Sequence, residues 1–256
     1  MSRLDGKVGF VTGGGSGIGR AVALAMVDEG AAALVVADID AEGARETVAL
    51  VEAKGGRGLA LAVDVTDGEA VERAVAATVE TYGGLDVASN NAGVNGAGGR
   101  TGDYDVDDWR RTLDINLTGT FLCLRAELRA MSPSTGGFGG AIVNMSSGAG
   151  LMGFPGLPAY VASKHGILGL TKAAALEYVR EGIRVNAVCP GSTRTPLLEG
   201  FMAQDPGIEK MITRGSPIGR LANPEEIAAA VVWLCSDDAS FVVGHALVAD
   251  AGATIQ

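Results

Sequence analysis

A tyrosine and a lysine four positions apart could work as an acid/base pair. Tyr160 and Lys164 open a periodic apolar stretch that is typical of a helix, so both side chains should share one helix face. A phenol carries protons poorly at neutral pH because its pKa is about 10. A nearby ammonium favours the phenolate, which would make Tyr160 a general acid or base. Ser147 follows an apolar run at 141–145 and could hydrogen-bond the same substrate oxygen. On its own, a tyrosine–lysine pair on a helix usually has no function, so the surrounding sequence has to decide.

A glycine-rich turn occupies residues 12–19, between an apolar run at 8–11 and a helical pattern. Strand, turn and helix in this order direct free backbone N–H groups and the positive end of a helix dipole at one point, which suits a phosphate. Gly17 and Gly19 have no side chain to hold a ligand away, and Gly13 can adopt the dihedral angles of the turn. The alternative is a glycine-rich loop without a ligand.

A carboxylate follows the next apolar run. Asp38 ends the run at 33–38 and lies 19 positions after Gly19, where a dinucleotide-binding fold places the acid that holds the adenosine ribose. Its charge favours NAD, because the 2′-phosphate of NADP would meet like charge. Neither Ser16 nor Ile39 is the basic residue that such a phosphate would need. The alternative is a surface aspartate at the end of a strand.

Short apolar runs alternate with longer periodic stretches along the whole chain, which predicts a parallel sheet covered on both faces. We therefore expect an α/β fold of the doubly wound Rossmann type, with seven parallel strands, in one domain spanning 1–256. The strands are expected near 7–12, 33–38, 59–63, 85–89, 140–145, 183–189 and 245–249. The helices are expected near 17–30, 41–54, 67–82, 107–131, 158–181 and 224–235.

Polar residues follow two further strands of the predicted sheet. Asp64 could accept a hydrogen bond from an adenine amino group or could cap the next helix, and position alone does not decide. The segment 90–93, Asn-Asn-Ala-Gly, should lie beside the glycine turn, where its amides could tie strand ends together or form only a turn. Asn116 lies in an apolar helix face, so it must be hydrogen-bonded, as a structural tie or as part of a polar relay.

Composition limits the classes of function. The chain has 256 residues, 47% of them hydrophobic, and a net charge of −10. The negative charge argues against nucleic acid as a partner. Its three cysteines are widely spaced in apolar runs, so we expect buried free thiols, no metal site and a cytoplasmic protein. No run reaches the roughly 18 apolar residues of a membrane span, so we expect no membrane association.

Taken together, these residues resemble the classical short-chain dehydrogenases/reductases. The resemblance covers nearly the whole chain and includes the turn at 12–19, the chemistry-bearing side chains and Pro190-Gly191. Ser147 stands thirteen positions before Tyr160, the spacing of the family, which favours it over Ser146.

The resemblance implies a role for each catalytic residue. Tyr160 would exchange a proton with the substrate hydroxyl or carbonyl, and Ser147 would orient that oxygen. Lys164 would lower the pKa of the tyrosine and hold the nicotinamide ribose. Asn116 would position a water molecule in a proton relay through Lys164.

The resemblance also implies a nicotinamide dinucleotide as cofactor, and Asp38 makes NAD the expected one. Asn91 would pack near a cofactor ribose. Thr193 would contact the carboxamide by its backbone and Thr195 by its hydroxyl. The full set of expected cofactor-binding residues is Gly13, Gly15, Ser16, Gly17, Ile18, Gly19, Asp38, Ile39, Asp64, Val65, Asn91, Ala92, Gly93, Tyr160, Lys164, Pro190, Gly191, Thr193 and Thr195.

The family keeps a mobile substrate lid near 193–216, and this stretch is rich in apolar side chains. A mostly apolar pocket is expected from Leu151, Phe154, Leu197, Leu198, Phe201, Met202, Met211 and Ile212. Arg194 and Arg214 could bind an anion, although solvated arginines are the simpler interpretation. The expected substrate is an uncharged secondary alcohol or ketone that could be cyclic.

Two other functions stay open at this stage: an NADP-dependent biosynthetic reductase, and a non-catalytic dinucleotide-binding protein on the same fold. The family commonly forms homotetramers through the helices near 107–131 and 158–181, so a homotetramer is expected.

Overall fold

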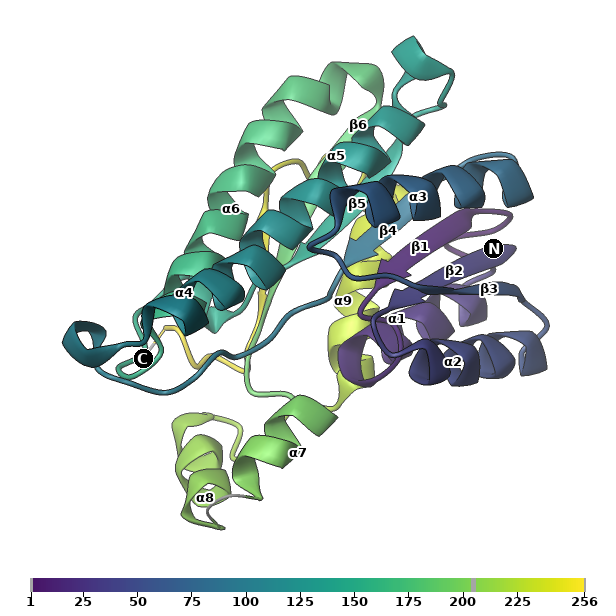
Figure 1. Cartoon of the computed structure of the whole chain (residues 1–256). Coiled ribbons are helices and arrows are strands. Elements are labelled where there is room, and N and C mark those ends of the chain that lie inside the picture. Colours follow the sequence, from purple (N-terminus) through teal and green to yellow (C-terminus); the bar gives the residue numbers. More distant parts are fainter. Residues whose placement is uncertain (1, 204–205, 256) are drawn as a thin grey trace.

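The computed structural model describes residues 2–203 and 206–255. Within them, seven parallel strands form one sheet in the order β3-β2-β1-β4-β5-β6-β7 (Figure 1). The strands are β1 (Val8–Thr12), β2 (Ala33–Asp38), β3 (Arg57–Ala62), β4 (Val87–Asn90), β5 (Gly140–Met145), β6 (Ile183–Pro190) and β7 (Ala246–Ala249). The predicted doubly wound Rossmann sheet is confirmed.

Helices cover both faces of the sheet. They are α1 (Gly17–Asp28), α2 (Ala41–Ala53), α3 (Gly68–Tyr82), α4 (Val106–Leu113), α5 (Gly119–Met131), α6 (Pro158–Tyr178), α7 (Pro196–Met202), α8 (Pro206–Gly215) and α9 (Pro224–Cys235). One apolar core packs beneath α1, α2 and α9, and the other beneath α3, α5 and α6. Neighbouring strand residues alternate between the two: Phe10 faces the second core and Val11 the first. Burial on both faces explains why the strands appear as continuous apolar runs.

The order of the strands reverses between β1 and β4. The chain leaves β1 through β2 and β3 on one side, then crosses back to form β4 on the other. Thr12 of β1 pairs with Asn90 of β4, and Asn90 pairs in turn with Asn144 of β5. The carboxyl ends of these three strands therefore meet at one edge, at the crevice where open α/β sheets bind ligands.

Several sequence-based predictions need correction. The single helix expected over 107–131 is two α-helices joined by a five-residue π-helical turn, Asp114–Thr118, which contains Asn116. The apolar period continues through the turn, so the sequence pattern conceals it. Asp67, not Asp64, caps α3, since its Oδ1 accepts from the N–H groups of Glu69 and Ala70 at 3.0 and 3.1 Å.

The stretch expected to form the lid contains two helices, α7 and α8. They lie beyond the carboxyl edge of the sheet, outside both helical layers (Figure 1). No helices were predicted here, because the stretch lies between β6 and α9 and so does not stand alone between two strands as a βαβ helix would.

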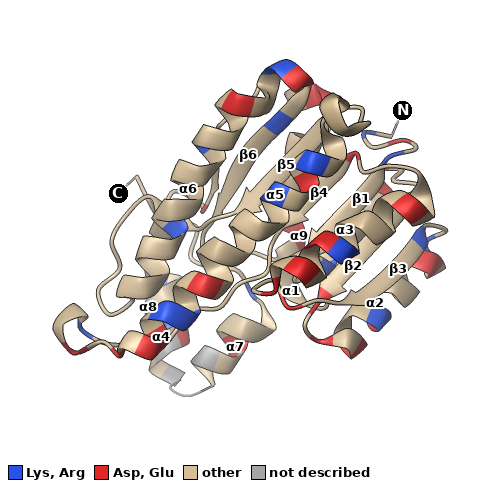
Figure 2. Cartoon of the chain, turned by 45° about the horizontal axis from the view of Figure 1, so that its top comes forward, with Lys and Arg blue, Asp and Glu red and all other residues tan. Residues whose placement is uncertain are grey.

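Acidic and basic residues are interspersed along the helices (Figure 2). Glu72 on α3, for example, pairs with Arg125 and Arg129 on α5, at 2.7 and 3.1 Å. Such exposed pairs each contribute about 1 kcal/mol or less. Of the helices described, none has the length and apolar character to cross a membrane.

The cysteines are buried and free, as predicted. Among residues 2–203 and 206–255, no three His, Cys, Asp or Glu side chains come together as a metal site.

Candidate active site

The glycine turn leaves an open cradle at the start of α1. Gly13 and Gly17 have φ angles of 61° and 51°, which favour glycine. A Cβ on Gly19 would lie 2.1 Å from the carbonyl oxygen of Gly13. The side chain of Ser16, the residue before α1, makes no capping hydrogen bond. The first N–H groups of α1 are therefore left for an anion, which fits the pyrophosphate of a dinucleotide.

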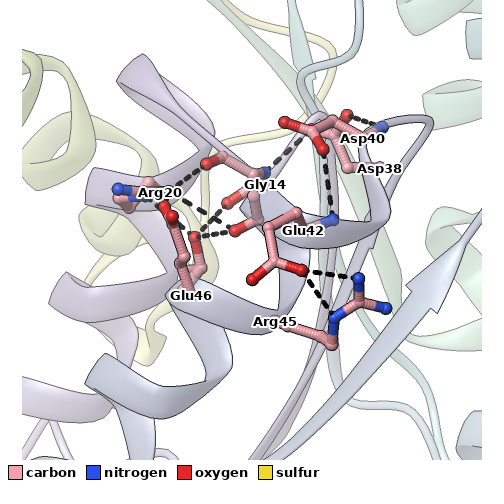
Figure 3. Close-up of polar contacts among 10 residues, drawn as sticks. Gly14, Arg20, Asp38, Asp40, Glu42, Arg45 and Glu46 are labelled. Atoms are coloured by element: carbon pink, nitrogen blue, oxygen red, sulfur yellow. Dashed lines mark hydrogen bonds and ion pairs between the residues drawn. The ribbon is translucent and has the colours of Figure 1, made fainter.

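Side chains outside the turn fix its backbone (Figure 3). Asp38 Oδ2 accepts from the Gly15 N–H at 2.8 Å. Thr47 Oγ1 donates to the Gly14 carbonyl at 2.9 Å, and Arg20 donates to the Gly15 carbonyl and to Thr47 Oγ1. Sequence reasoning missed Arg20 and Thr47, because neither belongs to a motif and both act from the far side of the turn. Their contacts hold the turn in shape without entering the ligand space.

Asp38 has a second contact. Its Oδ1 accepts from the Asp40 N–H at 2.9 Å. A carboxylate offers about four acceptor positions, so both oxygens can still accept from ribose hydroxyls. Ile39 beside it is exposed and lines the same cleft. The nearby guanidinium of Arg20 is paired with Glu46 at 2.8 Å.

Amide side chains join the strand ends, which decides between the two possibilities that the sequence left open for the segment 90–93. Asn91 Nδ2 donates to the Gly13 carbonyl at 3.2 Å, and Asn90 Nδ2 donates to Asn144 Oδ1 at 3.0 Å. A Cβ on Gly93 would lie 3.1 Å from Asn116 Oδ1. The segment 90–93 is thus more than a turn: it fixes the spacing between β1, β4 and β5.

Asn116 is completely buried in the π-helical turn. Its Oδ1 accepts from the Val94 N–H at 2.8 Å, and its Nδ2 donates to the Val94 carbonyl and to Ser163 Oγ, at 2.9 and 3.1 Å. Both amide hydrogens are used, so the side chain is a structural tie.

The candidate catalytic side chains come together at the end of β5. Lys164 Nζ donates to the Met145 carbonyl at 2.9 Å and lies 5.5 Å from the centre of the Tyr160 ring. Ser147 Oγ accepts from the Ala149 N–H at 3.1 Å. The side chains of Ser147, Tyr160 and Lys164 all line one cleft.

The ionisation of the pair differs from the sequence-based expectation. Burial raises the pKa of Tyr160, and a hydrogen bond with Ser147 opposes this shift. Burial also lowers the pKa of Lys164 to about 8. Without a bound cofactor, the pKa of Tyr160 therefore lies above its ordinary value, because desolvation outweighs the hydrogen bond with Ser147.

The cleft has a volume of about 2180 Å³. Ligand pockets usually measure about 300–1,000 Å³, so there is room for a dinucleotide together with a second molecule. Of the predicted cofactor residues it is lined by Gly13, Ser16, Gly17, Ile18, Asp38, Ile39, Asp64, Val65, Asn91, Ala92, Gly93, Tyr160, Lys164, Pro190, Gly191, Thr193 and Thr195. Gly15 and Gly19 do not line it; they shape the turn from behind.

One end of the cleft has an apolar wall. Phe154, Leu197, Leu198 and Ile212 line it as predicted, and Met152, Leu157 and Ile218 were missed. Leu151 does not line it, and Met202 is buried instead. The side chains of Phe201 and Met211 lie outside the described residues.

Arg194 is not held ready for an anion. It pairs with Glu209 at 3.3 Å and Glu199 at 3.7 Å, within the segment expected to form the lid. Arg214 is exposed.

A tyrosine clamp, formed by Tyr104 and Asp108, holds the loop at 94–100, which lines the cleft. The Tyr104 hydroxyl lies 2.5 Å from Asp108 Oδ2 and 3.0 Å from the Ala97 carbonyl, and Asp108 Oδ2 also accepts from the Ala97 N–H at 2.8 Å. The hydrogen bond from Tyr104, followed by that from Ala97, lowers the pKa of Asp108. Gly99 N–H then donates to the Gly156 carbonyl at 2.9 Å. The clamp therefore fixes the loop at 94–100, and the Gly99–Gly156 hydrogen bond joins this loop to the loop that precedes Tyr160.

Comparison with known proteins identifies the family. A family model described as enoyl-(acyl carrier protein) reductase matches residues 13–254. A 2,5-dichloro-2,5-cyclohexadiene-1,4-diol dehydrogenase of Sphingobium indicum is 46% identical over 254 residues, covering 99% of each chain. The chain belongs to the classical short-chain dehydrogenase/reductase family. It is therefore an oxidoreductase acting on CH–OH groups, with a nicotinamide dinucleotide as cofactor, and the resemblance in sequence is confirmed.

Two further similarities place this short-chain dehydrogenase/reductase among its relatives. A cyclohexanol dehydrogenase of Acinetobacter sp. is 42% identical over 253 residues, covering 99% of this chain and 97% of the relative. A crystal structure of carveol dehydrogenase from Mycobacterium avium in complex with NAD has a TM-score of 0.93 and 32% identity, and the match covers 100% of both chains.

The tyrosine clamp should affect binding of the alcohol substrate and leave binding of the cofactor unchanged. Tyr104→Phe removes the hydroxyl that holds Asp108 and Ala97, so we expect the free energy of unfolding to fall by about 1 kcal/mol. KM for an alcohol should rise several-fold while KM for the nicotinamide cofactor stays unchanged. Steady-state kinetics with each substrate varied in turn would measure this. Tyr178→Phe is the control, because within the described residues the Tyr178 hydroxyl makes no hydrogen bond. A rise in both KM values would contradict the assignment of the loop at 94–100 to the alcohol-binding part of the cleft.

Proposed function

We propose that the protein is an NAD-dependent dehydrogenase of uncharged, cyclic secondary alcohols, working reversibly on the corresponding ketones. The observation that carries this proposal is the single cleft that holds Ser147, Tyr160 and Lys164 between a dinucleotide cradle and an apolar wall.

Each catalytic side chain has a distinct task in the proposed reaction. The cofactor, when bound, accepts or supplies the hydride at the substrate carbon. Tyr160 takes the hydroxyl proton during oxidation and returns it during reduction. Ser147 hydrogen-bonds the same oxygen and orients it. Lys164, fixed by the Met145 carbonyl, holds the nicotinamide ribose and favours the phenolate by its charge.

We assign Asn116 a part in a proton relay through Lys164. Its neighbourhood supports this, since a Cβ on Gly93 would touch Asn116 Oδ1 at 3.1 Å and Lys164 Nζ at 3.6 Å. Both hydrogens of the Asn116 amide are already used, so the side chain carries no proton itself. Its part in the relay is to hold the π-helical turn in place beside Lys164.

NAD is favoured over NADP at the adenosine end. Asp38 presents a carboxylate whose oxygens are 2.8 and 2.9 Å from backbone N–H groups, so it cannot turn away from a ribose. The guanidinium of Arg20, which contacts the glycine turn, is paired with Glu46. The carveol dehydrogenase of similar structure was crystallised with NAD.

The substrate class rests on the apolar wall and on the relatives. Phe154, Leu197 and Ile218 expose 43%, 49% and 57% of their surface, which a ring could cover. The relatives named for a cyclohexadiene diol and for cyclohexanol act on six-membered rings. Arg194 is paired with acids, which disfavours an anionic substrate.

We further propose a cytoplasmic homotetramer. Three buried free thiols suit a reducing compartment. Phe121 on α5 and Leu176 on α6 expose 45% and 78% of their surface, as expected of helix faces that pack against other subunits. Sedimentation equilibrium would test this, and a monomer at micromolar concentration would contradict it.

The preference for NAD can be measured by binding. NADH should bind at least about tenfold more tightly than NADPH, a difference of about 1.4 kcal/mol. Asp38→Asn keeps an oxygen for the Gly15 N–H but removes the charge. It should therefore strengthen NADPH binding and bring the Kd values for NADPH and NADH closer together. Asp40→Asn is the control, since Asp40 caps α2 and asparagine caps equally well. Tighter binding of NADPH by the wild type would instead favour a biosynthetic reductase.

The proton transfer can be tested separately from binding. Tyr160→Phe should lower kcat by about 10²–10⁴-fold, the usual contribution of a positioned acid or base, while the Kd for NADH stays within about twofold. The rate of wild-type alcohol oxidation should rise with pH, because the reaction needs a phenolate whose pKa burial has raised. The residual rate of the variant should lack this dependence. Unchanged turnover in Tyr160→Phe would refute the mechanism, and an inactive wild type that still binds NADH would favour a non-catalytic protein.

A further inference from the structure

A buried acid lies behind the site, on the inner face of α5. Glu127 is 0% exposed, and its Oε2 accepts from Asn90 Nδ2 at 2.8 Å. Asn90 Nδ2 also donates to Asn144 Oδ1, and Asn144 Nδ2 donates to Thr171 Oγ1 at 3.0 Å. Together these four hydrogen-bonded side chains connect α5, β4, β5 and α6. We call them the Glu127 chain. No motif led to Glu127, and the proposed reaction does not use it.

Two oxygens of the Glu127 chain have no donor. Glu127 Oε1 and Asn90 Oδ1 are both buried without a hydrogen-bond partner in the part of the chain described. If Glu127 were ionised, both atoms would be acceptors only, and each unmet acceptor costs about 1–3 kcal/mol. A proton on Oε1 turns that oxygen into a donor. The acid and the amide could then bond reciprocally, N–H to Oε2 and O–H to Oδ1.

We propose that Glu127 is held as a neutral carboxylic acid, paired with the Asn90 amide, and that this pair positions the ends of β4 and β5. Burial raises the pKa of Glu127 to about 8, against the opposing hydrogen bond from Asn90. The titratable neighbour on its own helix is Cys123, whose thiol pKa is raised by burial and then by Glu127. The other members of the Glu127 chain, on β4, β5 and α6, are uncharged. Glu72 of α3 is exposed and paired with arginines.

The position of the pair links it to the site. Asn90 precedes Asn91, whose amide holds the Gly13 carbonyl of the dinucleotide cradle. Asn144 precedes Met145, whose carbonyl holds Lys164. Glu127 itself lines no part of the cleft, so it is a positioning residue. Its effect on turnover rests on the proposed function, whereas its protonation does not.

The protonation state can be read from stability. The folded-state pKa of about 8 lies above the ordinary value of 4.5, so the folded protein binds more protons between these values, and stability should fall as pH rises through this window. Glu127→Gln supplies the same donor and acceptor without a proton to lose. The Tm of Glu127→Gln minus that of the wild type should therefore grow with pH up to about 8 and then level off.

Infrared spectroscopy gives a second readout. The carbonyl band of a protonated carboxylic acid should be present in the wild type at pH 6 and absent from Glu127→Gln. Glu80→Gln, at an exposed carboxylate on α3, should change neither the band nor the pH dependence of Tm. Parallel Tm profiles for wild type and Glu127→Gln, or no acid band, would show that Glu127 is ionised and would overturn the proposal.

The positioning role needs a variant that cannot pair. Glu127→Met keeps the length but removes both hydrogen bonds, so the Kd for NADH should rise at least about fivefold, while Glu127→Gln keeps the wild-type value within about twofold. Equal affinities in the two variants would contradict positioning. Because NADH binding, Tm and the acid band need no turnover, a failure of the proposed reaction would leave this test decisive.

Discussion

The fixed spacing between the carboxyl ends of β1, β4 and β5 is the constraint on which the site depends. Backbone pairing aligns Thr12, Asn90 and Asn144 across the three strands. Side-chain amides then extend this order past the last backbone bonds, where loops would otherwise be free. The glycine turn, the segment 91–93 and Ser147 follow these strand ends in the sequence, and Lys164 is held by the Met145 carbonyl at the end of β5. Small shifts here would therefore disturb binding and catalysis together.

Burial holds the side chains of Tyr160 and Lys164 in place, but it also disfavours their charged forms. Desolvation raises the pKa of the Tyr160 phenol and lowers that of the Lys164 ammonium to about 8, so it disfavours the charged form of each group when no cofactor is bound. The positive charge of an oxidised nicotinamide acts in the opposite direction, towards the phenolate. Ionisation of the pair is thereby linked to the presence of the cofactor, which suits a base that should act only in the complete complex.

The sequence predicted the strands well and predicted that Ser147, Tyr160 and Lys164 come together, because both leave local signals: apolar runs for buried strands, and characteristic residue types at fixed spacings. It did not predict the π-helical turn around Asn116, whose apolar period runs on unbroken. It also missed Thr47, Arg20, Tyr104 and Glu127. These side chains act through contacts between residues distant in sequence, and nothing in their own neighbourhood marks them. Asp64 shows the remaining limit, since only the structure could decide that Asp67 caps α3.

The most direct test of the account is turnover of ring alcohols, followed by the absorbance of the reduced nicotinamide. Purified protein would receive NAD or NADP with cyclohexanol, a cyclic diol, an acyclic secondary alcohol and a ring alcohol carrying a carboxylate. The account predicts reduction of NAD by the uncharged ring alcohols, with kcat/KM above that for the acyclic and the anionic compounds and above all values with NADP. Faster reaction with NADP, or preference for the anionic ring, would contradict it.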